Sequence, residues 1–163
     1  MAGRCLLYYI TDRSQFPGDE PARRRALLAK IVEAAQAGVD YIQLREKDLT
    51  ARELEVLARK AVAIIRENTL TTDHQSRATR LLINSRTDIA LAVGADGVHL
   101  PSDDISTSEV RQIWSKCGVG APARERPVIA VSCHTHADIL RAESDCCRTG
   151  ASRREGIPSL QNA

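Results

Sequence analysis

The sequence has neither a long hydrophobic run nor an excess of charge of one sign. No window approaches eighteen consecutive apolar residues, and no charged start precedes a hydrophobic signal segment. We therefore expect neither a membrane partner nor an export signal. The formal net charge is only +2, which gives no reason to expect nucleic acid as a partner. A hydrophobic content of 43% is typical of a soluble globular protein, and 163 residues suit one domain.

The cysteines lack the spacing of a metal site and are odd in number: Cys5, Cys117, Cys133, Cys146 and Cys147. Because no export signal precedes them, reduced thiols in the cytoplasm are the expected state. At Cys133, a small buried thiol is favoured over a catalytic one. His134 and His136 are spaced as a pair of metal ligands, but no third ligand lies near them in the sequence, which disfavours a metal site there.

A glycine-rich phosphate loop is also missing after the first apolar segment, where residues 11–17 read TDRSQFP. The segments with strand propensity are 6–11, 41–45, 81–84, 97–100 and 128–132. Helical patterns follow them at 20–37, 50–64, 88–93, 106–114 and 135–143, and residues 67–79 read as a loop. This alternation predicts a parallel α/β sheet with right-handed crossovers. A doubly wound sheet would normally carry the missing glycine-rich loop, so a barrel of alternating strands and helices is favoured.

Gln43, Arg45 and Lys47 recur with period two at the end of the second apolar segment. On a strand they would project from the same face. The guanidinium fork binds two oxygens and the ammonium adds a point charge, so the set suits a phosphate or pyrophosphate. The alternative is that both cations are solvated beyond the end of the strand. Their alignment with Gln43 favours binding.

Four motifs together resemble the thiamine-phosphate synthase family, within a superfamily that includes thiazole tautomerases. They are YITD at 9–12, QLREK at 43–47, LLINSRTDIALAVGADGVHLP at 81–101 and VIAVSCHT at 128–135. The resemblance spans roughly residues 5–143. It implies a TIM (β/α)₈ barrel of which about five of the eight units are present. It also implies a transferase of thiamine biosynthesis that joins a pyrimidine methyl diphosphate to a thiazole phosphate and releases pyrophosphate.

The resemblance also assigns the diphosphate-binding residues. Gln43, Arg45 and Lys47 would hold the pyrimidine diphosphate, and the two cations would act in catalysis by meeting the charge of the leaving pyrophosphate. Ser132 would touch the pyrophosphate, and Asp104 would ligate Mg²⁺.

Two further residues are assigned to the pyrimidine ring by the same resemblance. Asn84 would contact the aminopyrimidine, and His99 would lie beside it. Each has a simpler alternative: Asn84 as a cap of the following helix, and His99 as a hydrogen-bonded core or rim histidine.

Ser85 departs from the family pattern, which has Asp as the second magnesium ligand at this position. A serine hydroxyl is a poor ligand beside a carboxylate, so we expect weaker metal binding unless Asp103 or water compensates. Thiazole tautomerases also lack the acidic residue, so a tautomerase-like isomerase is the second functional hypothesis.

The family pattern stops near Ser144, and residues 144–163 have no apolar periodicity. We expect a domain over residues 1–143 and a disordered tail over 144–163, derived from a truncated or frameshifted reading frame. Five strands do not close the barrel. We therefore expect a chain that folds partially, associates with itself through open sheet edges, or aggregates. The thiazole phosphate site would be missing. A third hypothesis is therefore an inactive remnant that binds phosphate ligands at most.

Overall fold

A computed structural model of the chain describes residues 5–71, 78–117 and 126–147. Its sheet has five strands in the order β1 (Tyr8–Ile10), β2 (Tyr41–Leu44), β3 (Arg80–Asn84), β4 (Gly97–Leu100) and β5 (Val128–Val131). Every neighbouring pair is parallel. The helices between and after the strands are η1 (Arg13–Gln15), α1 (Glu20–Gln36), α2 (Ala51–Thr71), α3 (Thr87–Val93), α4 (Thr107–Cys117) and α5 (His136–Cys147). The predicted parallel sheet of strand–helix units is therefore confirmed.

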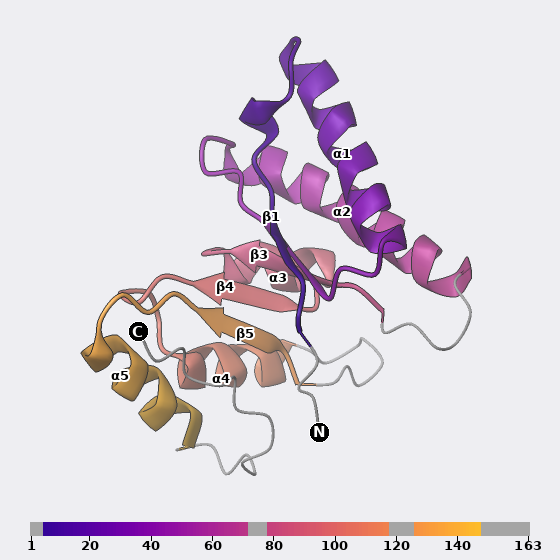
Figure 1. The fold of residues 1–163 in the computed structure, drawn as a ribbon. Helices are drawn as coiled ribbons and strands as arrows, with labels where there is room; N and C mark the ends of the chain where they lie inside the picture. The colour runs from indigo at the N-terminus through magenta and orange to yellow at the C-terminus, as the bar shows by residue number, and fades with distance from the viewer. Residues whose placement is uncertain (1–4, 72–77, 118–125, 148–163) are drawn as a thin grey trace.

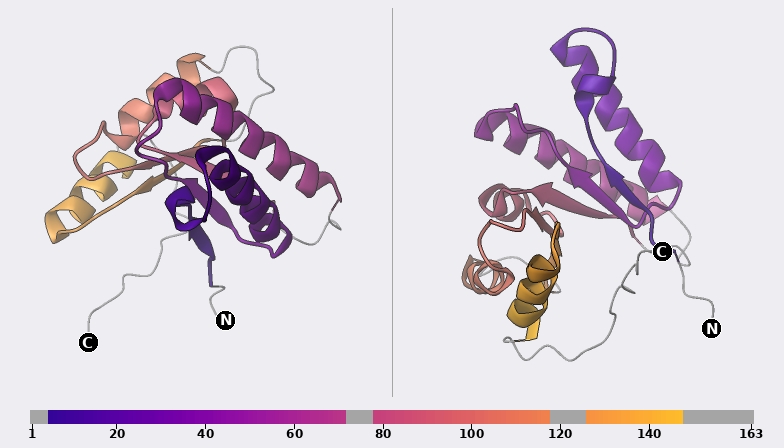
Figure 2. Two further views of the ribbon diagram at one scale, coloured as in Figure 1. Left: turned by 90° about the horizontal axis from the view of Figure 1, so that it is seen from above. Right: turned by 60° about the vertical axis from the view of Figure 1, so that its left-hand side comes forward.

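Successive helices contact one another and follow the sheet as an arc (Figures 1 and 2). Alternate strand residues face them: Ile42 and Leu44 on β2 and Val98 and Leu100 on β4 are almost fully buried in the helix-packed core. Because side chains alternate along a strand, the residues between them face the opposite side of the sheet. We call this opposite side the inner face. It carries Gln43 and His99, so the alternation of β2 and β4 separates the core from the candidate site.

The predicted helix starts are confirmed at the capping boxes of α2 and α4. In the first, Glu53 N–H donates to Thr50 Oγ1 at 3.3 Å and Thr50 N–H donates back to the Glu53 carboxylate at 3.0 Å. Ser106 and Glu109 form the same reciprocal pair at 3.2 and 2.8 Å. Each box satisfies two N–H groups that have no partner within the helix. The boxes thereby fix where each loop from the sheet enters its helix.

Helix α2 extends further than the sequence predicts: residues 67–71 lack apolar periodicity, which favours a loop, but they are helical. Asn68 explains part of the extension, since its side chain donates to the Ile64 carbonyl at 2.8 Å and accepts from Gln36 Nε2 at 3.3 Å. The polar end of α2 is thus tied to the end of α1. The remaining predicted loop residues up to 77 lie outside the described part of the chain.

The two outer strands each pair on one side only within the described residues. Strand β1 and the residues before it expose large apolar side chains, namely Leu6, Leu7, Tyr8 and Ile10. Such a strand is an open edge. In the described part of the chain, no helix has both the length and the apolar character needed to cross a membrane. The expected tail of 144–163 lies mostly outside the described residues, and α5 continues to Cys147.

Candidate functional site

Amide side chains from β2 and β3 form the first half of a hydrogen-bonded network on the inner face. Gln43 is 2% exposed, and its Nε2 donates to Asn84 Oδ1 at 2.7 Å. Asn84 Nδ2 in turn donates to Ser85 Oγ at 3.0 Å, and Gln43 Oε1 accepts from the Tyr8 hydroxyl at 3.2 Å. The amide of Asn84 therefore points along the sheet. The N-cap of α3 is Arg86, which makes no side-chain cap hydrogen bond, so the cap interpretation of Asn84 is wrong.

The second half of this network joins β4 to the residue after β5. His99 is half-buried, with Nδ1 2.9 Å from the Tyr8 hydroxyl and Nε2 2.7 Å from Ser132 Oγ. The Ser132 backbone N–H donates to the Leu100 carbonyl at 2.9 Å, which holds the hydroxyl beside the ring. Gly97 permits the close approach of β4 and β5, because a Cβ there would collide with the Val128 carbonyl oxygen.

We refer to Ser85, Asn84, Gln43, Tyr8, His99 and Ser132 as the inner-face network. It brings together Gln43, Asn84, His99 and Ser132, which the sequence singled out separately. Sequence reasoning missed Tyr8. The available signal was its alternation with Ile10, since both pair with β2 in register and lie on one side of β1.

Arg45 and Lys47 lie beyond the end of β2, in the loop that leads to α2, and both are exposed. The Arg45 backbone N–H donates to Thr11 Oγ1 at 3.0 Å. Burial lowers the pKa of His99, and the nearby Arg45 charge lowers it further. Arg45 is therefore within electrostatic range of the inner-face network, and the imidazole favours its neutral form.

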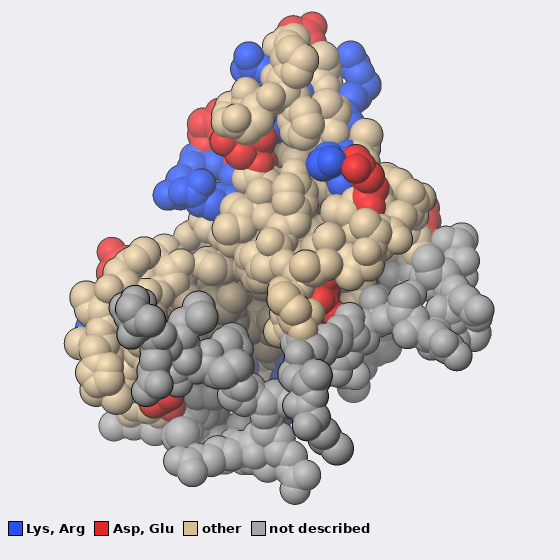
Figure 3. Space-filling model, in the orientation of Figure 1, with Lys and Arg blue, Asp and Glu red and all other residues tan. Residues whose placement is uncertain are grey.

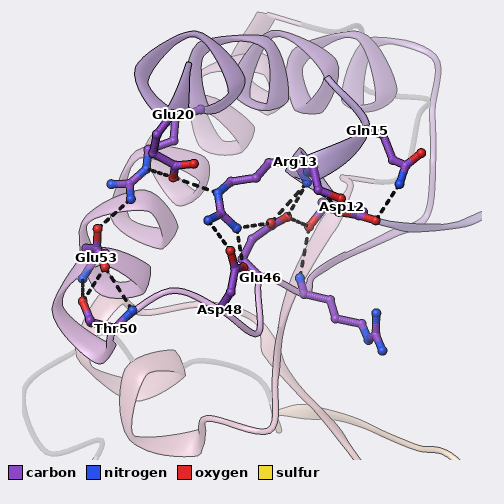
Figure 4. Close-up of polar contacts among 12 residues, drawn as sticks. Asp12, Arg13, Gln15, Glu20, Glu46, Asp48, Thr50 and Glu53 are labelled. Carbon is purple, nitrogen blue, oxygen red and sulfur yellow. Dashed lines mark hydrogen bonds and ion pairs between the residues drawn. The ribbon is translucent and has the colours of Figure 1, made fainter. Parts of the chain in front are cut away.

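The residues that alternate with these two cations, Glu46 and Asp48, contact Arg13 on the side of the loop away from the inner face (Figure 4). Arg13 is 6% exposed, and its Nη1 and Nη2 donate to the two Asp48 carboxylate oxygens at 2.6 and 2.7 Å. Nη1 also contacts Glu46 at 3.0 Å, and the buried Glu46 carboxylate accepts from the Thr11 hydroxyl at 2.7 Å. These contacts hold the loop at Glu46 and Asp48, so Arg45 and Lys47 are left on its other side.

The ion pairs continue from Arg13 to the N-termini of α1 and α2 (Figure 4). Glu20 accepts from Arg13 Nε at 2.8 Å and from Arg24 Nε at 2.6 Å, and Arg24 Nη2 donates to Glu53 at 2.8 Å. The Thr50 hydroxyl and Arg24 lower the pKa of Glu53 to about 2. On the face drawn in Figure 3, the Lys and Arg side chains of this upper region are interspersed with Asp and Glu. Arg13, Arg24 and Lys30 are already paired with carboxylates, unlike Arg45 and Lys47, for which no ion pair occurs within the described residues.

A family model described as thiamine monophosphate synthase matches residues 7–149 of the sequence. The chain belongs to this family. The family resemblance seen in the motifs is thereby confirmed, and so is the expectation of a transferase family of thiamine biosynthesis.

Relatives of the thiamine monophosphate synthase family agree with this assignment. A thiamine-phosphate synthase of Syntrophomonas wolfei is 41% identical over 110 residues, which are 68% of this chain and 46% of that protein. A putative thiamine-phosphate synthase of Geobacter sulfurreducens is 44% identical over 128 residues, 78% of this chain and 49% of that protein. The solved thiamine phosphate pyrophosphorylase from Pyrococcus furiosus superposes with a TM-score of 0.61 at 27% identity, covering 86% of this chain and 55% of that one. The chain therefore spans about half the length of the relatives it matches.

Ser85 and Asp104, the positions that the family resemblance predicts as metal ligands, offer few donor atoms for a metal ion. Asp104 is exposed, and its Oδ1 accepts from Ile105 N–H at 2.8 Å. The described residues contain no group of three or more His, Cys, Asp or Glu side chains that could hold a metal ion. Mg²⁺ is commonly bound by one or two carboxylates together with substrate phosphate oxygens. One carboxylate and a hydroxyl fit an ion shared with a phosphate ligand better than a site built from protein groups alone.

Within the described residues, two hollows are lined by residues outside the inner-face network. A groove of about 490 Å³ lies between α1 and α2, and its polar lining includes Arg24, Arg25 and Lys60. A smaller cavity of about 130 Å³ lies between α5 and residues 100–107, which include Asp104. Cys133 is partly exposed, with its thiol 4.0 Å from the Val131 carbonyl. The first of these hollows is the main competitor to the inner face for a phosphate, because it is lined by cations.

Proposed function

We propose that this chain carries the pyrimidine diphosphate half of a thiamine-phosphate synthase active site. The observation that supports the proposal most is the position of the inner-face network. It reaches the carboxyl ends of β3 and β5 at Asn84 and Ser132, and the loop with Arg45 and Lys47 leaves the same end of β2. Active sites of barrels of alternating strands and helices lie at this end. In the proposed reaction the aminopyrimidinylmethyl carbon forms a bond to the nitrogen of a thiazole phosphate, its bond to oxygen breaks, and pyrophosphate leaves.

In this proposal Arg45 and Lys47 bind the leaving pyrophosphate and offset its negative charge. The charge on its oxygens increases as the carbon–oxygen bond breaks, so the two cations stabilise the transition state more than the ground state. The guanidinium of Arg45 can bind two oxygens at once. Ser132 adds a hydroxyl on the same side. The electron-rich aminopyrimidine stabilises the carbon cation, so no strong base is needed before the thiazole nitrogen attacks.

Gln43 and Asn84 are proposed to bind the aminopyrimidine. Each side-chain amide has two N–H groups and a carbonyl with two lone pairs, and their mutual hydrogen bond uses only one donor and one acceptor. Gln43 is buried in an orientation fixed by both of its neighbours. Fixed donors and acceptors of this kind can distinguish an amino group from a ring nitrogen.

Mg²⁺ is proposed as the cofactor, held by Asp104 and by oxygens of the diphosphate. When bound, it would neutralise part of the charge that develops on the pyrophosphate. Ser85 weakens the site relative to the family pattern, because a hydroxyl replaces a carboxylate. We therefore expect Mg²⁺ to bind together with the diphosphate rather than to the protein alone.

The alternatives remain a tautomerase-like isomerase and a remnant that only binds phosphate. The names of the relatives favour the synthase. The thiazole phosphate site of the family falls in the part of the relatives that this chain does not match, so coupling by this chain alone is the least supported step. Ser85 and the Leu100–Pro101 pair after His99 are the features that favour the tautomerase.

Titration calorimetry with a 4-aminopyrimidine methyl diphosphate tests the proposal. We expect binding that requires Mg²⁺ and that weakens at least about tenfold in Arg45→Ala, since a charge-assisted, two-point contact is lost. Arg59→Ala is the matched control, because it removes an exposed guanidinium that pairs with Glu55 on α2. Binding of thiazole phosphates alone would favour the tautomerase, and a folded protein that binds neither ligand would contradict both enzyme proposals.

We also propose that two copies associate through the open edge of β1, and that the protein works in the cytoplasm. Within the described residues β1 pairs with β2 alone, and the exposed Leu6, Leu7 and Ile10 beside this edge support the first proposal. The free thiols of Cys5, Cys117 and Cys133 support the second. Sedimentation of Ile10→Lys against the unchanged protein tests the association, and equal masses would contradict it.

A further inference from the structure

Tyr8 contacts both halves of the inner-face network, although it lies outside the four family motifs. Its hydroxyl is 3.2 Å from Gln43 Oε1 and 2.9 Å from His99 Nδ1. Gln43 belongs to β2 and His99 to β4, so the tyrosine reaches from β1 across the concave side of the sheet. Among the described residues, it is the one side chain that links the amides to the His99–Ser132 pair.

The hydrogen bonds around Tyr8 have a single direction. Gln43 Nε2 donates to Asn84, which turns Gln43 Oε1 toward Tyr8. This oxygen only accepts, and a phenol has one proton, so Tyr8 donates to Gln43. The same phenol oxygen must then accept in its 2.9 Å contact, and His99 Nδ1 is the donor.

This direction fixes the tautomer of His99. Neutral imidazole has one N–H, and here it lies on Nδ1. Nε2 therefore carries a lone pair and accepts from the Ser132 hydroxyl at 2.7 Å. Flipping the side-chain amides of Gln43 and Asn84 would reverse the direction of every hydrogen bond in the series. The Tyr8 hydroxyl therefore couples the amide orientation to the tautomer of His99. Burial raises the pKa of Tyr8 to about 12, so the phenol keeps its proton at neutral pH.

We propose that Tyr8 is a positioning residue that holds His99 as the Nδ1–H tautomer. Through His99 it links the direction of the Ser132 hydroxyl to the orientation of the Gln43 and Asn84 amides. The consequence for ligands rests on the proposed function. A diphosphate beside Ser132 and an aminopyrimidine beside Gln43 then contact one linked set of hydrogen bonds. Contacts at either end affect those at the other.

Nitrogen-15 spectroscopy of the full chain tests the tautomer without any ligand, with the His99 signals assigned from their loss in His99→Gln. The unchanged protein should show the Nδ1–H form, and Tyr8→Phe should populate the Nε2–H form. Tyr41→Phe is the control: its ring packs 6.0 Å from that of Tyr8, and its hydroxyl makes no hydrogen bond within the described residues. An Nε2–H form in the unchanged protein, or the same tautomer in Tyr8→Phe, would overturn the proposal.

Binding measurements separate this role from the function itself. Tyr8→Phe should weaken binding of the 4-aminopyrimidine methyl diphosphate about two- to tenfold relative to inorganic pyrophosphate, the effect of one hydrogen bond. An unchanged ratio would overturn the coupling between the two ends. If the unchanged protein binds neither ligand, the proposed function is contradicted. The nitrogen-15 measurement of the His99 tautomer then still tests the role of Tyr8.

Discussion

The guanidinium of Arg13 and the carboxylate of Asp48 form a two-point ion pair at 2.6 and 2.7 Å, although 35 residues separate them. Asp48 itself is largely exposed, so water screens its side of the pair. The buried part of the contact is between Arg13 and Glu46, whose side chains are 7% and 2% exposed. Together they fix the loop after β2 at two alternate residues, and this loop carries Arg45 and Lys47.

Arg13→Lys tests the importance of the guanidinium geometry. The ammonium keeps the charge beside Glu46 but loses the paired donors to Asp48. We expect a loss of about 1.5–3 kcal/mol in the free energy of unfolding, the worth of a hydrogen bond to a charged group. Urea denaturation measures it, with the exposed Arg59→Lys as a control expected to stay within about 0.5 kcal/mol. Equal midpoints for the two variants would show that the fork does not stabilise the loop.

The ion pairs at the starts of α1 and α2 predict a loss of stability in acid. The Thr50 hydroxyl and Arg24 lower the pKa of Glu53 from 4.5 to about 2, and Arg13 lowers the pKa values of Glu20 and Asp48. A carboxyl whose pKa is lower in the folded state stabilises the fold above its unfolded pKa. That contribution disappears as the pH falls from about 4.5 to about 2. Denaturation midpoints should therefore fall over this range, and less steeply in Glu53→Gln. Parallel pH profiles for the two proteins would contradict the assignment.

The raised pKa of Tyr8 predicts a loss of stability in alkali as well. Burial, with the neighbouring Tyr41, raises its pKa from 10 to about 12. A phenol with a raised folded-state pKa stabilises the fold below its unfolded pKa, so stability should decrease as the pH rises from 10 toward 12. Titration of the phenolate absorbance should show a component near pH 12 that disappears in Tyr8→Phe. Burial also raises the pKa of Tyr9, so its contribution should be identified from its loss in Tyr9→Phe. A component near pH 12 of the same amplitude in Tyr8→Phe and the unchanged protein would assign it to another tyrosine.

Ser85 predicts a gain of metal binding on substitution. Its φ of +57° lies in the left-handed region, which Asp and Asn adopt more readily than most residues. Ser85→Asp should therefore fold without added strain and supply a second carboxylate. We expect Mg²⁺ to bind about tenfold more tightly in the presence of the pyrimidine diphosphate, about 1.4 kcal/mol.

Ser85→Gly is the matched control for this substitution, because it relieves the backbone without adding a ligand. Magnesium titrations of both variants separate the two effects. If the aspartate and glycine variants bind Mg²⁺ equally, Ser85 does not occupy a metal-ligand position.

The sequence predicts the elements of this fold well because each has a local cause. The capping boxes at Thr50 and Ser106 and the apolar stripes that follow need no information from distant residues. The family motifs also identify Gln43, Asn84, His99 and Ser132 individually. Their hydrogen bonds to one another depend on strand register, which the sequence does not supply.

Contacts across the curved sheet and between loops have no local signal. Tyr8 meets His99 only because the sheet curls, and Arg13 meets Asp48 only because η1 turns its side chain toward the loop after β2. The sequence predicts a strand over 41–45 and one shared face for Gln43, Arg45 and Lys47. Strand β2 ends at Leu44, and the alternation is maintained in the loop because Glu46 contacts Arg13 on the other side.

The most direct test of the account is to map where a pyrimidine diphosphate binds. Backbone amide spectra of the labelled chain, recorded as 4-aminopyrimidine methyl diphosphate is added with Mg²⁺, report every residue near the ligand. We expect the largest changes at Gln43, Arg45, Asn84 and Ser132, at or beside the carboxyl ends of the strands. Changes confined to the groove between α1 and α2, at Arg24, Arg25 and Lys60, would contradict it.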